Sequence, residues 1–436
     1  MAISNISAYS HLSDADIADI GARLDRIYAE IREDLGHRDV RYIKNLIRVQ
    51  RGLEFGGRIA MLIPRSRAAR WGGIGAVSLA KILENLEIGH NTMHGQWDWM
   101  NDPEVHSAYW EWDNTCPASG WKHSHNFVHH KYTNVLGMDN DVGYGVLRVT
   151  RERAWSPGHL LQPVTNVVLA ALFQWAVAFY DVELGRVFAG KKKWAEAKPQ
   201  LKEVLAKSGR QVAKDYLLFP ALAGTRFGEV AKANMYANLI RSVWAYAVIF
   251  CGHFPDAAET FTKEQYANET HEEWYLRQML GSANFTGGFL LSVLSGNLNY
   301  QIEHHLYPDM PSNRLAEAAK RVRAICDEYD LPYNTGSFPR QFLQVQRTLL
   351  KLTLPNRFLV ADPDNAPEVR SERAFVKYPQ VESALDAHAR PRRGLRTGLR
   401  LLKRLRPGVR EVIAAYTGRS TRAAAPAAAG RGAVAG

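Results

Sequence analysis

Apolar residues near the start of the chain recur at helical spacing among charged ones. Ser13 is a typical helix N-cap, and the apolar positions that follow it are Ile17, Ile20, Leu24, Ile27 and Ile31. Residues 38–53 continue this pattern of apolar residues at helical spacing among charged ones. Because only one face of each helix is apolar, the pattern predicts a cytosolic helical region over residues 1–53.

Two apolar stretches follow, at residues 55–64 and 71–90, joined by a basic turn. The first is short for a membrane span, and the second is long enough only if Lys81, Glu84 and Glu87 are included. Charges inside a span are costly and usually face a functional interior. We therefore expect the second stretch to span the membrane and to carry polar groups toward a site in its last turns.

A third apolar stretch, residues 164–180, lies between two segments that we expect on the same side of the membrane. Residues 91–160 are polar and rich in Trp, His and Asp, and residues 186–214 are basic. Basic loops favour the cytoplasmic side, so a single crossing between the two segments is excluded. The third stretch is therefore predicted to form a re-entrant or surface-lying helix.

The remaining apolar residues predict a hairpin of two spans, at residues 216–227 and 235–253, with Arg241 as the weak point of the second. From Pro311 onward the sequence is soluble and helical, then loop-like, and residues 390–436 form a basic tail with interspersed leucines. Such a tail suits an anionic membrane surface. A disordered basic tail without a defined partner explains the same composition.

Composition narrows the class of protein. The 436 residues are 46% hydrophobic and 23% charged, which excludes a disordered, collagen-like or disulfide-scaffold protein. The mean hydropathy of −0.28 is low for a polytopic transporter. Three cysteines are too few for a four-cysteine metal site and fit a reduced cytoplasmic setting. The first residues lack the pattern of a cleavable signal peptide, so the N-terminus is expected in the cytoplasm.

The net charge of +11 favours anionic partners, either lipid headgroups, nucleic acid or a phosphate-bearing substrate. Nucleic acid is the weakest of these, because the basic residues are spread and form no recognisable module. Lys191, Lys192 and Lys193 are placed to meet CoA phosphates, but a positive-inside bias explains them without any substrate.

Histidine is concentrated in one part of the chain. Seven of the fifteen histidines fall within residues 90–130. The candidate ligands are His90 and His94; His125, His129 and His130; His304 and His305, preceded by Gln301; and His253 at the end of the last predicted span. Residues four apart on a helix share a face, so two imidazoles can reach one metal ion.

Eight imidazoles exceed one tetrahedral site and imply two metal ions. Imidazole suits zinc, copper, iron and nickel alike, so the ligand type does not fix the metal. Zinc hydrolysis calls for His-Glu-x-x-His or for a water-activating carboxylate beside three ligands. The first two histidine clusters have no Glu in that place.

The residues around these clusters resemble the three histidine boxes of the integral-membrane fatty acid desaturases. The matching strings are Gly-His90-Asn-Thr-Met-His94-Gly-Gln-Trp, His125-Asn-Phe-Val-His129-His130-Lys-Tyr-Thr-Asn and Asn-Tyr-Gln301-Ile-Glu-His304-His305-Leu-Tyr-Pro. The resemblance covers about residues 40–355. Flanking strings at residues 137–144 and 251–256 look most similar to the stearoyl-type acyl-CoA desaturases of actinobacteria.

The resemblance implies an all-α integral membrane protein with about four transmembrane helices and a cytosolic helical cap that holds a histidine-rich di-iron site. Residues 54–312 would form the membrane domain, and residues 313–389 a cytosolic C-terminal region. The eight histidines would hold two iron ions, with O2 as co-substrate. The implied reaction introduces a double bond, at the Δ9 position, into C16–C18 acyl chains carried on CoA. The enzyme would lie in the cell membrane with its active site and both termini cytoplasmic.

Some positions need separate comment. Gln301 stands where many relatives have His, which makes it a doubtful ligand, and His123 forms an additional His-x-His that points elsewhere if that stretch is helical. Gln301, Glu87, Asp139 and Asp141 are candidates to hydrogen-bond ligating imidazoles, and solvated charges explain the carboxylates equally well. The tryptophans after the first box, Trp97, Trp99, Trp110 and Trp112, suit the wall of an acyl tunnel or an interfacial aromatic belt.

The electrons must come from elsewhere. The sequence contains no glycine-rich dinucleotide fingerprint, four-cysteine iron-sulfur motif or His-Pro-Gly-Gly haem signature. We therefore expect a separate NADPH-dependent flavoprotein or ferredoxin reductase. A membrane hydroxylase or alkane oxygenase uses a similar histidine set and is the alternative. A membrane metal carrier is less consistent with the sequence. Its ligands should lie near the bilayer midplane, whereas these histidine clusters lie beyond the ends of the predicted spans.

Overall fold

The computed structural model describes residues 8–358 except 64–65, 140 and 189. It divides the chain into two compact units, Met1–Thr353 and Leu354–Gly436. In the second unit, the described residues end with the short turn η11 (Asn356–Phe358). The predicted basic tail, residues 390–436, lies outside the described residues.

The first helix follows the sequence pattern closely. Helix α1 (Asp14–Glu33) begins at Ser13, whose side chain accepts a hydrogen bond from the backbone N–H of Asp16 at 3.2 Å, while the Asp16 carboxylate accepts one from the N–H of Ser13 at 2.9 Å. The predicted apolar positions are all buried, against α14 (His271–Gly281) and α17 (Leu315–Glu328). The helix predicted after Ser13 is confirmed.

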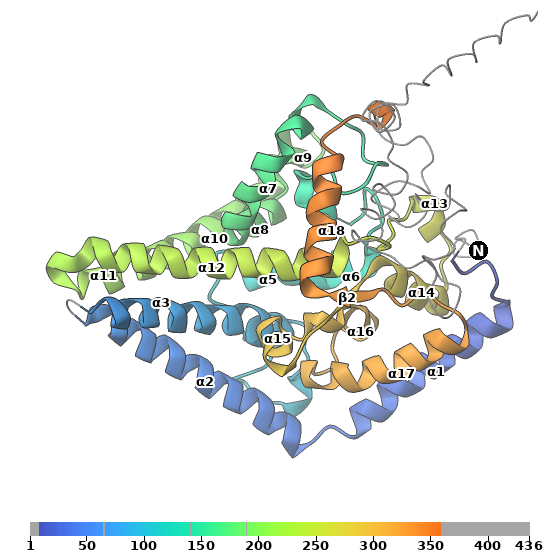
Figure 1. Cartoon of the computed structure of the whole chain (residues 1–436), viewed down its shortest axis with the longest axis horizontal. Coiled ribbons are helices and arrows are strands. Elements are labelled where there is room, and N and C mark those ends of the chain that lie inside the picture. Colours follow the sequence, from blue (N-terminus) through green and yellow to red (C-terminus); the bar gives the residue numbers. More distant parts are fainter. Residues whose placement is uncertain (1–7, 64–65, 140, 189, 359–436) are drawn as a thin grey trace, which may run out of the picture. The chain divides into compact units, whose positions relative to one another are not determined.

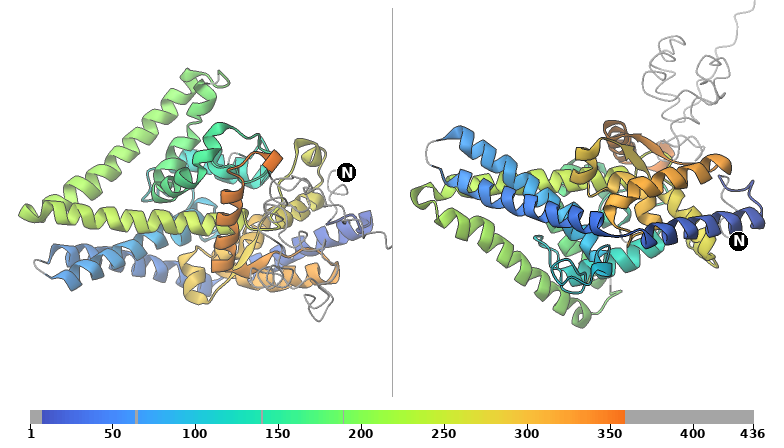
Figure 2. Two further views of the ribbon diagram at one scale, coloured as in Figure 1. Left: turned by 45° about the horizontal axis from the view of Figure 1, so that its top comes forward. Right: turned by 90° about the horizontal axis from the view of Figure 1, so that it is seen from below.

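Four long helices form two hairpins in the first unit (Figures 1 and 2). In one hairpin α2 (His37–Leu62) packs on α3 (Arg67–Ile82), which continues as the π-helical η2 (Leu83–His90). In the other, α10 (Trp194–Val212) continues as the π-helical η7 (Ala213–Leu218) and returns as α12 (Phe227–His253). Helix α12 lies against α3 and joins the two hairpins.

These helices begin earlier than the predicted spans. Helix α2 is continuous from His37, and α10 begins at Trp194 rather than near residue 216. The extensions are amphipathic: Ile43 and Ile47 of α2 are buried, and so is Val204 of α10. Tertiary packing of one apolar face stabilises a helix well beyond its most apolar stretch. The hairpin predicted at residues 216–227 and 235–253 is present, but its first helix begins much earlier than the predicted span. The helical pattern predicted over residues 38–53 is part of α2, which continues to Leu62.

Among the described residues, no single helix is both long and apolar enough to meet a length and hydropathy criterion for a membrane span. Residues Pro157–Ala171 and Phe173–Asp181 meet it only as a pair, with a bend of 95° between them. The bend agrees with the re-entrant or surface-lying helix expected at residues 164–180. The long helices fail the criterion partly because they carry charged side chains, and several of these are buried: Arg58, Lys81, Asp215 and Arg241.

The long helices expose many large apolar side chains. Phe55 of α2 is 70% exposed and Trp71 of α3 is 63% exposed. Further exposed apolar side chains on the hairpins are Val49, Ile59, Ile63, Leu79, Leu205, Leu217, Leu218, Leu222, Met235, Leu239, Ile240 and Val243. So many exposed apolar side chains on two hairpins suit contact with a protein or a membrane.

Most of the remaining elements lie near the ends of α3 and α12 that are distant from the hairpin loops (Figure 1). Helix α11 (Phe219–Ala221) and the turn Gly224–Arg226 instead lie in the hairpin loop that precedes α12. The short strands β1 (Asn284–Thr286) and β2 (Thr335–Ser337) pair in parallel and precede α15 (Phe289–Leu294) and α18 (Phe338–Lys351), respectively. The other helices are α4 (Asn91–Met93), α5 (Ala118–Trp121), η4 (Lys122–His129), α6 (His130–Tyr132), α7 (Gln162–Ala171), α8 (Phe173–Asp181), α9 (Leu184–Phe188), α11 (Phe219–Ala221), α13 (Lys263–Tyr266) and α16 (Gln301–Leu306), with 3-10 turns at Asp98–Met100, Val142–Gly145, Pro157–Leu161, Gly224–Arg226, Leu298–Tyr300 and Ser312–Arg314.

Candidate metal centre

Four separate parts of the chain bring the predicted histidines together. The first box lies at the end of η2 and in the turn after α4, the second in η4 and α6, and the third in α16, while His253 is the last residue of α12. Both η2 and η4 are π-helical rather than α-helical, and π-helical turns inside helices occur frequently at functional sites. The three boxes and His253 thus converge from segments more than two hundred residues apart.

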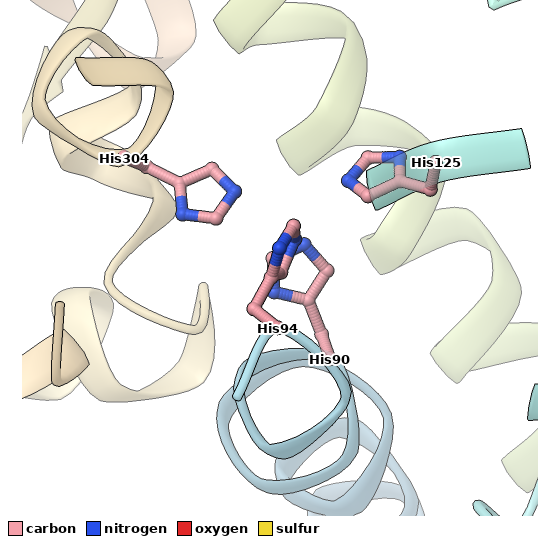
Figure 3. Close-up of side chains that lie close together, drawn as sticks. All are labelled: His90, His94, His125 and His304. Carbon is pink, nitrogen blue, oxygen red and sulfur yellow. The ribbon is translucent and has the colours of Figure 1, made fainter. Parts of the chain in front are cut away.

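One group of imidazoles surrounds a common space (Figure 3). The ligand nitrogens of His90, His94, His125 and His304 all lie within 4.8 Å of one another. The ring centroid of His94 lies 4.6 Å from that of His90, 5.2 Å from that of His125 and 4.7 Å from that of His304. This spacing allows one metal ion to contact all four rings.

A second group lies beside the first. His129, His253 and His305 also place their ligand nitrogens within 4.8 Å of one another. The ring of His130 lies between the two groups, 4.7 Å from the ring of His94 and 4.4 Å from that of His305. All eight predicted histidines therefore belong to one cluster with room for two neighbouring ions.

Hydrogen bonds to Nδ1 orient several of the rings. His129 Nδ1 lies 3.0 Å from a carboxylate oxygen of Asp139, and His125 Nδ1 lies 3.4 Å from Asp141. His305 Nδ1 lies 3.0 Å from the amide oxygen of Gln278. In each case the bond holds the ring so that Nε2 is left for another partner, which is the usual arrangement of a metal-ligating imidazole.

Many ring nitrogens in the cluster have no hydrogen-bond partner among the described residues. They are Nε2 of His94, His125, His129 and His305, Nδ1 of His253, and both ring nitrogens of His130 and His304. Burial, followed by the neighbouring imidazoles, holds the pKa of His94 and of His304 well below the ordinary value. A neutral imidazole has a nitrogen lone pair that can bind a metal ion. A cluster of such nitrogens suits zinc, copper, iron or nickel.

The two remaining residues of the predicted set lie in different surroundings. Glu87 accepts hydrogen bonds from Tyr42 at 2.7 Å, Asn297 at 3.0 Å and Ser312 at 2.5 Å, so its described partners are not imidazoles. It ties η2 to α2 and to the segments that flank the third box. Gln301 lies in the cluster, with its Nε2 3.1 Å from Nε2 of His253.

Sequence reasoning missed several groups that support the cluster. Gln278 contacts His305, and Glu303 accepts hydrogen bonds from Asn284 at 2.9 Å and from Tyr333 at 2.8 Å. Burial raises the pKa of Glu303 to about 7. A carboxylate between Gln301 and the His304–His305 pair was a visible signal for Glu303, but nothing in the sequence marks Gln278.

His123 is exposed, and its ring stacks on Phe127 at 5.9 Å. It lies on the outer side of the helix whose inner side carries His125 and His129. The expectation that it points away from the other rings agrees with this placement, although its role stays a prediction.

A pocket adjoins the histidine cluster. Its lining includes His90, His125, His253 and Gln301 at one end, and its walls are largely apolar and aromatic: Leu86, Trp112, Trp121, Tyr144, Phe173, Val177, Ala245, Ile249 and Leu298. Trp112 thus lines the pocket, as the tunnel interpretation of the tryptophans expected. Trp97 instead is fully buried against α2. A long apolar ligand fits walls of this kind.

The sequence model of the fatty acid desaturase family matches residues 69–337, more than half of the chain. The chain belongs to this family. It is 52% identical over 403 residues to the NADPH-dependent stearoyl-CoA 9-desaturase of Mycobacterium tuberculosis, a match that covers 92% of this chain and 94% of that protein. It is 24% identical to the sn-1 linoleoyl-lipid 6-desaturase of Synechocystis over 72% of this chain and 88% of the relative. The resemblance of the three histidine boxes is therefore confirmed, and the desaturase is an enzyme of the oxidoreductase class.

Proposed function

We propose that this desaturase introduces a Δ9 double bond into saturated C16–C18 acyl chains carried on CoA. The observation that carries the proposal is that two groups of imidazoles, most of which have a ring nitrogen without a hydrogen-bond partner among the described residues, adjoin an apolar pocket. The 52% identity to a stearoyl-CoA 9-desaturase supports the substrate and the position of the double bond.

Two iron ions are the cofactor that we propose for the cluster. One ion would be held by His90, His94, His125 and His304, and the other by His129, His253 and His305, with His130 between them. Bound iron with O2 supplies the oxidising power for removing hydrogen from an unactivated methylene pair, which no side chain can supply.

The chain's own residues position the reactants. The carboxylates of Asp139 and Asp141 hold the rings of His129 and His125 with Nε2 facing the interior of the cluster. The apolar pocket walls exclude water and restrict the acyl chain to one path past the histidines. Glu87 fixes the end of η2, because it accepts three hydrogen bonds from other segments.

We propose that the two hairpins cross the cell membrane and that the histidine cluster and both termini are cytoplasmic. The exposed apolar side chains of α2, α3 and α12 support contact with lipid. The charged side chains of these helices are paired inside the protein, as Lys81 with Asp215 at 2.9 Å, which is how membrane proteins accommodate charge. On this basis residues 54–312 remain the proposed membrane domain, between a cytosolic region over residues 1–53 and cytosolic segments over 313–389 and 390–436.

Electrons would come from a separate NADPH-dependent reductase. The printed name of the mycobacterial relative includes NADPH dependence, while this sequence carries no motif for a flavin, haem or iron-sulfur carrier. Purified chain should therefore be inactive with NADPH alone and active when a reductase is added. Turnover with NADPH alone would contradict the need for a partner.

Product analysis tests the proposed reaction. Membranes that contain the full chain are supplied with stearoyl-CoA, reductase, NADPH and O2, and the products are separated by gas chromatography with mass spectrometry. The expected product is the 9-monounsaturated acyl chain, together with bound iron in the purified protein. Hydroxystearate as the sole product would favour the hydroxylase alternative, and protein without iron would contradict the proposed cofactor.

A further inference from the structure

The pocket beside the histidines follows one face of α12. The lining residues on this helix are Ser242, Ala245, Ile249 and His253, at spacings of three, four and four, so they form one stripe. From His253 back to Ser242 the helix rises about 16 Å, at about 1.5 Å per residue. The stripe therefore runs from the histidine cluster into the space between the two hairpins.

Polar side chains close the pocket at the end distant from the histidines. Arg241 is 1% exposed and lines the pocket together with Ser242, Asn85 and Gln174. Its guanidinium donates to the amide oxygen of Gln174 and to the backbone oxygen of Asp113, the latter at 3.2 Å. Arg241 Nε and Ser242 Oγ are buried without a hydrogen-bond partner among the described residues. This end of the pocket is therefore polar, in contrast to its apolar walls.

Charged neighbours keep this closure in place. Lys81 Nζ lies 3.1 Å from Asp113 and 2.9 Å from Asp215, and Lys214 also pairs with Asp113. We call this set the ionic layer: Lys81, Asp113, Lys214, Asp215 and Arg241. Separating Lys81 from Asp215 would leave a buried charge without its partner, which is strongly unfavourable. Arg241 is held instead by its hydrogen bonds to Gln174 and to the backbone oxygen of Asp113. The layer is therefore a rigid boundary, tied to α3, η7 and α12.

We infer that the ionic layer limits the length of the acyl chain in the pocket, and that Arg241 and Gln174 are the side chains that its terminal methyl group meets. The inference rests on the proposed function, because the occupant is the acyl chain of the substrate. Each methylene gains free energy from apolar contacts along the stripe. At the layer a further methylene would have to displace hydrogen-bonded polar groups, which costs free energy.

The length of the stripe agrees with an 18-carbon chain. An extended chain advances about 1.2 Å per bond, as estimated from the span of an extended polypeptide backbone, so the eight bonds beyond carbon 10 extend over about 10 Å. This leaves about 6 Å of the stripe for the imidazole of His253 and the side chain of Arg241. Two more carbons need about 2.4 Å that only movement of Arg241 would provide.

Shortening the pocket is the first test. Ala245→Leu adds bulk to the stripe one helical turn before Arg241. Val243→Leu is the matched control, because Val243 lies on the same helix, is 43% exposed and is not part of the pocket lining. With full-length protein in membranes, a reductase and acyl-CoAs of 14 to 20 carbons, the ratio of 18-carbon to 16-carbon products should fall about ten-fold in Ala245→Leu. The control should keep the ratio of the unsubstituted protein.

Lengthening the pocket is the second test. Gln174→Ala removes an uncharged side chain at the layer, and Arg241→Ala removes the guanidinium while Lys81 and Lys214 still pair with the two aspartates. Both variants should raise the ratio of 20-carbon to 18-carbon products about ten-fold. Acyl-CoA binding is measured in parallel as the rise in melting temperature of the purified, iron-containing protein without reductase. The chain length that gives the largest rise should change in the same direction as the products.

The outcomes separate this inference from the proposed function. If the unsubstituted protein forms no unsaturated product and no acyl-CoA raises its melting temperature, the proposed function is wrong. Suppose instead that the unsubstituted protein forms unsaturated product and is stabilised by acyl-CoA. If Ala245→Leu and Gln174→Ala then bind iron normally but prefer the same acyl chain lengths as the unsubstituted protein, the ionic layer does not limit the length of the acyl chain. A change confined to Arg241→Ala, with both uncharged variants unchanged, would also overturn the inference, because it would reflect loss of charge pairing.

Discussion

Replacing His253 with Ala tests which isolated histidine belongs to the cluster. The His253 side chain is 4% exposed, and its ring lies 4.7 Å from that of His129 and 4.9 Å from that of His305. Its Nδ1 has no hydrogen-bond partner among the described residues. The matched control is His123→Ala, which removes an exposed imidazole stacked on Phe127.

The two substitutions should differ by orders of magnitude. Loss of a residue that only orients a ligating imidazole lowers metal affinity by about 10- to 100-fold, and loss of a ligand should cost at least as much. We therefore expect His253→Ala to lose at least one of the two irons and to retain less than about 1% of the activity. A surface substitution changes the free energy of unfolding by about 0.5 kcal/mol or less, so His123→Ala should keep most of its iron and activity.

Three measurements make the comparison decisive. Iron per chain is measured by mass spectrometry, product formation by gas chromatography, and the melting temperature with and without added iron. Iron at 100 times its dissociation constant stabilises the folded state by about 2.7 kcal/mol, and His253→Ala should lose most of this increment. Without iron, the variant should melt within a few degrees of the unsubstituted protein, which shows that it folds. Full iron and activity in His253→Ala, or their loss in His123→Ala, would refute the placement of the ligands.

Three further predictions follow from contacts in the cluster and on the outer surface. Asp139→Asn should lower iron affinity about 10- to 100-fold, because the neutral amide holds the Nδ1–H of His129 less strongly, and an iron titration with an unchanged affinity would exclude this role. Glu303→Ala removes the acceptor of hydrogen bonds from Asn284 and Tyr333 and should destabilise the fold by about 2–4 kcal/mol in denaturant unfolding, whereas Tyr333→Phe should cost about 1 kcal/mol. The full chain should sediment with membranes and resist extraction by high salt and carbonate, since its exposed apolar surface contacts lipid rather than headgroup charge; release by salt would contradict the two spanning hairpins.

The sequence pattern predicted helices where one apolar face persists. The spacing of Ile17, Ile20 and Leu24 after Ser13 placed α1 correctly, because capping and amphipathicity are local properties. The start of α2 agrees with the helical pattern predicted over residues 38–53. The start of α10 was not predicted, because its polar, charged turns are held by packing against other helices. Hydropathy located the apolar stretches of the hairpins, but each stretch is only part of a longer helix.

The sequence identified the histidines that the fold brings together, but few of the side chains that support them. The three boxes and His253 were recognisable because histidine at fixed spacing has few other uses. The partners of the ligands come from distant parts of the chain, as Gln278 does for His305, and a single sequence carries no signal for such a contact. Glu87 shows the converse: it lies three residues before His90, yet its carboxylate binds Tyr42, Asn297 and Ser312.

Two kinds of buried polar group in this chain explain both its stability and its chemistry. In the ionic layer the lysines and aspartates form ion pairs, as Lys81 does with Asp113 and Asp215, and Arg241 donates to Gln174. In the histidine cluster, several ring nitrogens have no hydrogen-bond partner among the described residues. A buried polar atom without a partner costs free energy, and a bound metal ion recovers that cost by accepting the lone pairs. The ion pairs therefore serve the structure, whereas the imidazole nitrogens without partners are the groups that a metal ion would satisfy, and metal binding would then stabilise the fold as well as supply the chemistry.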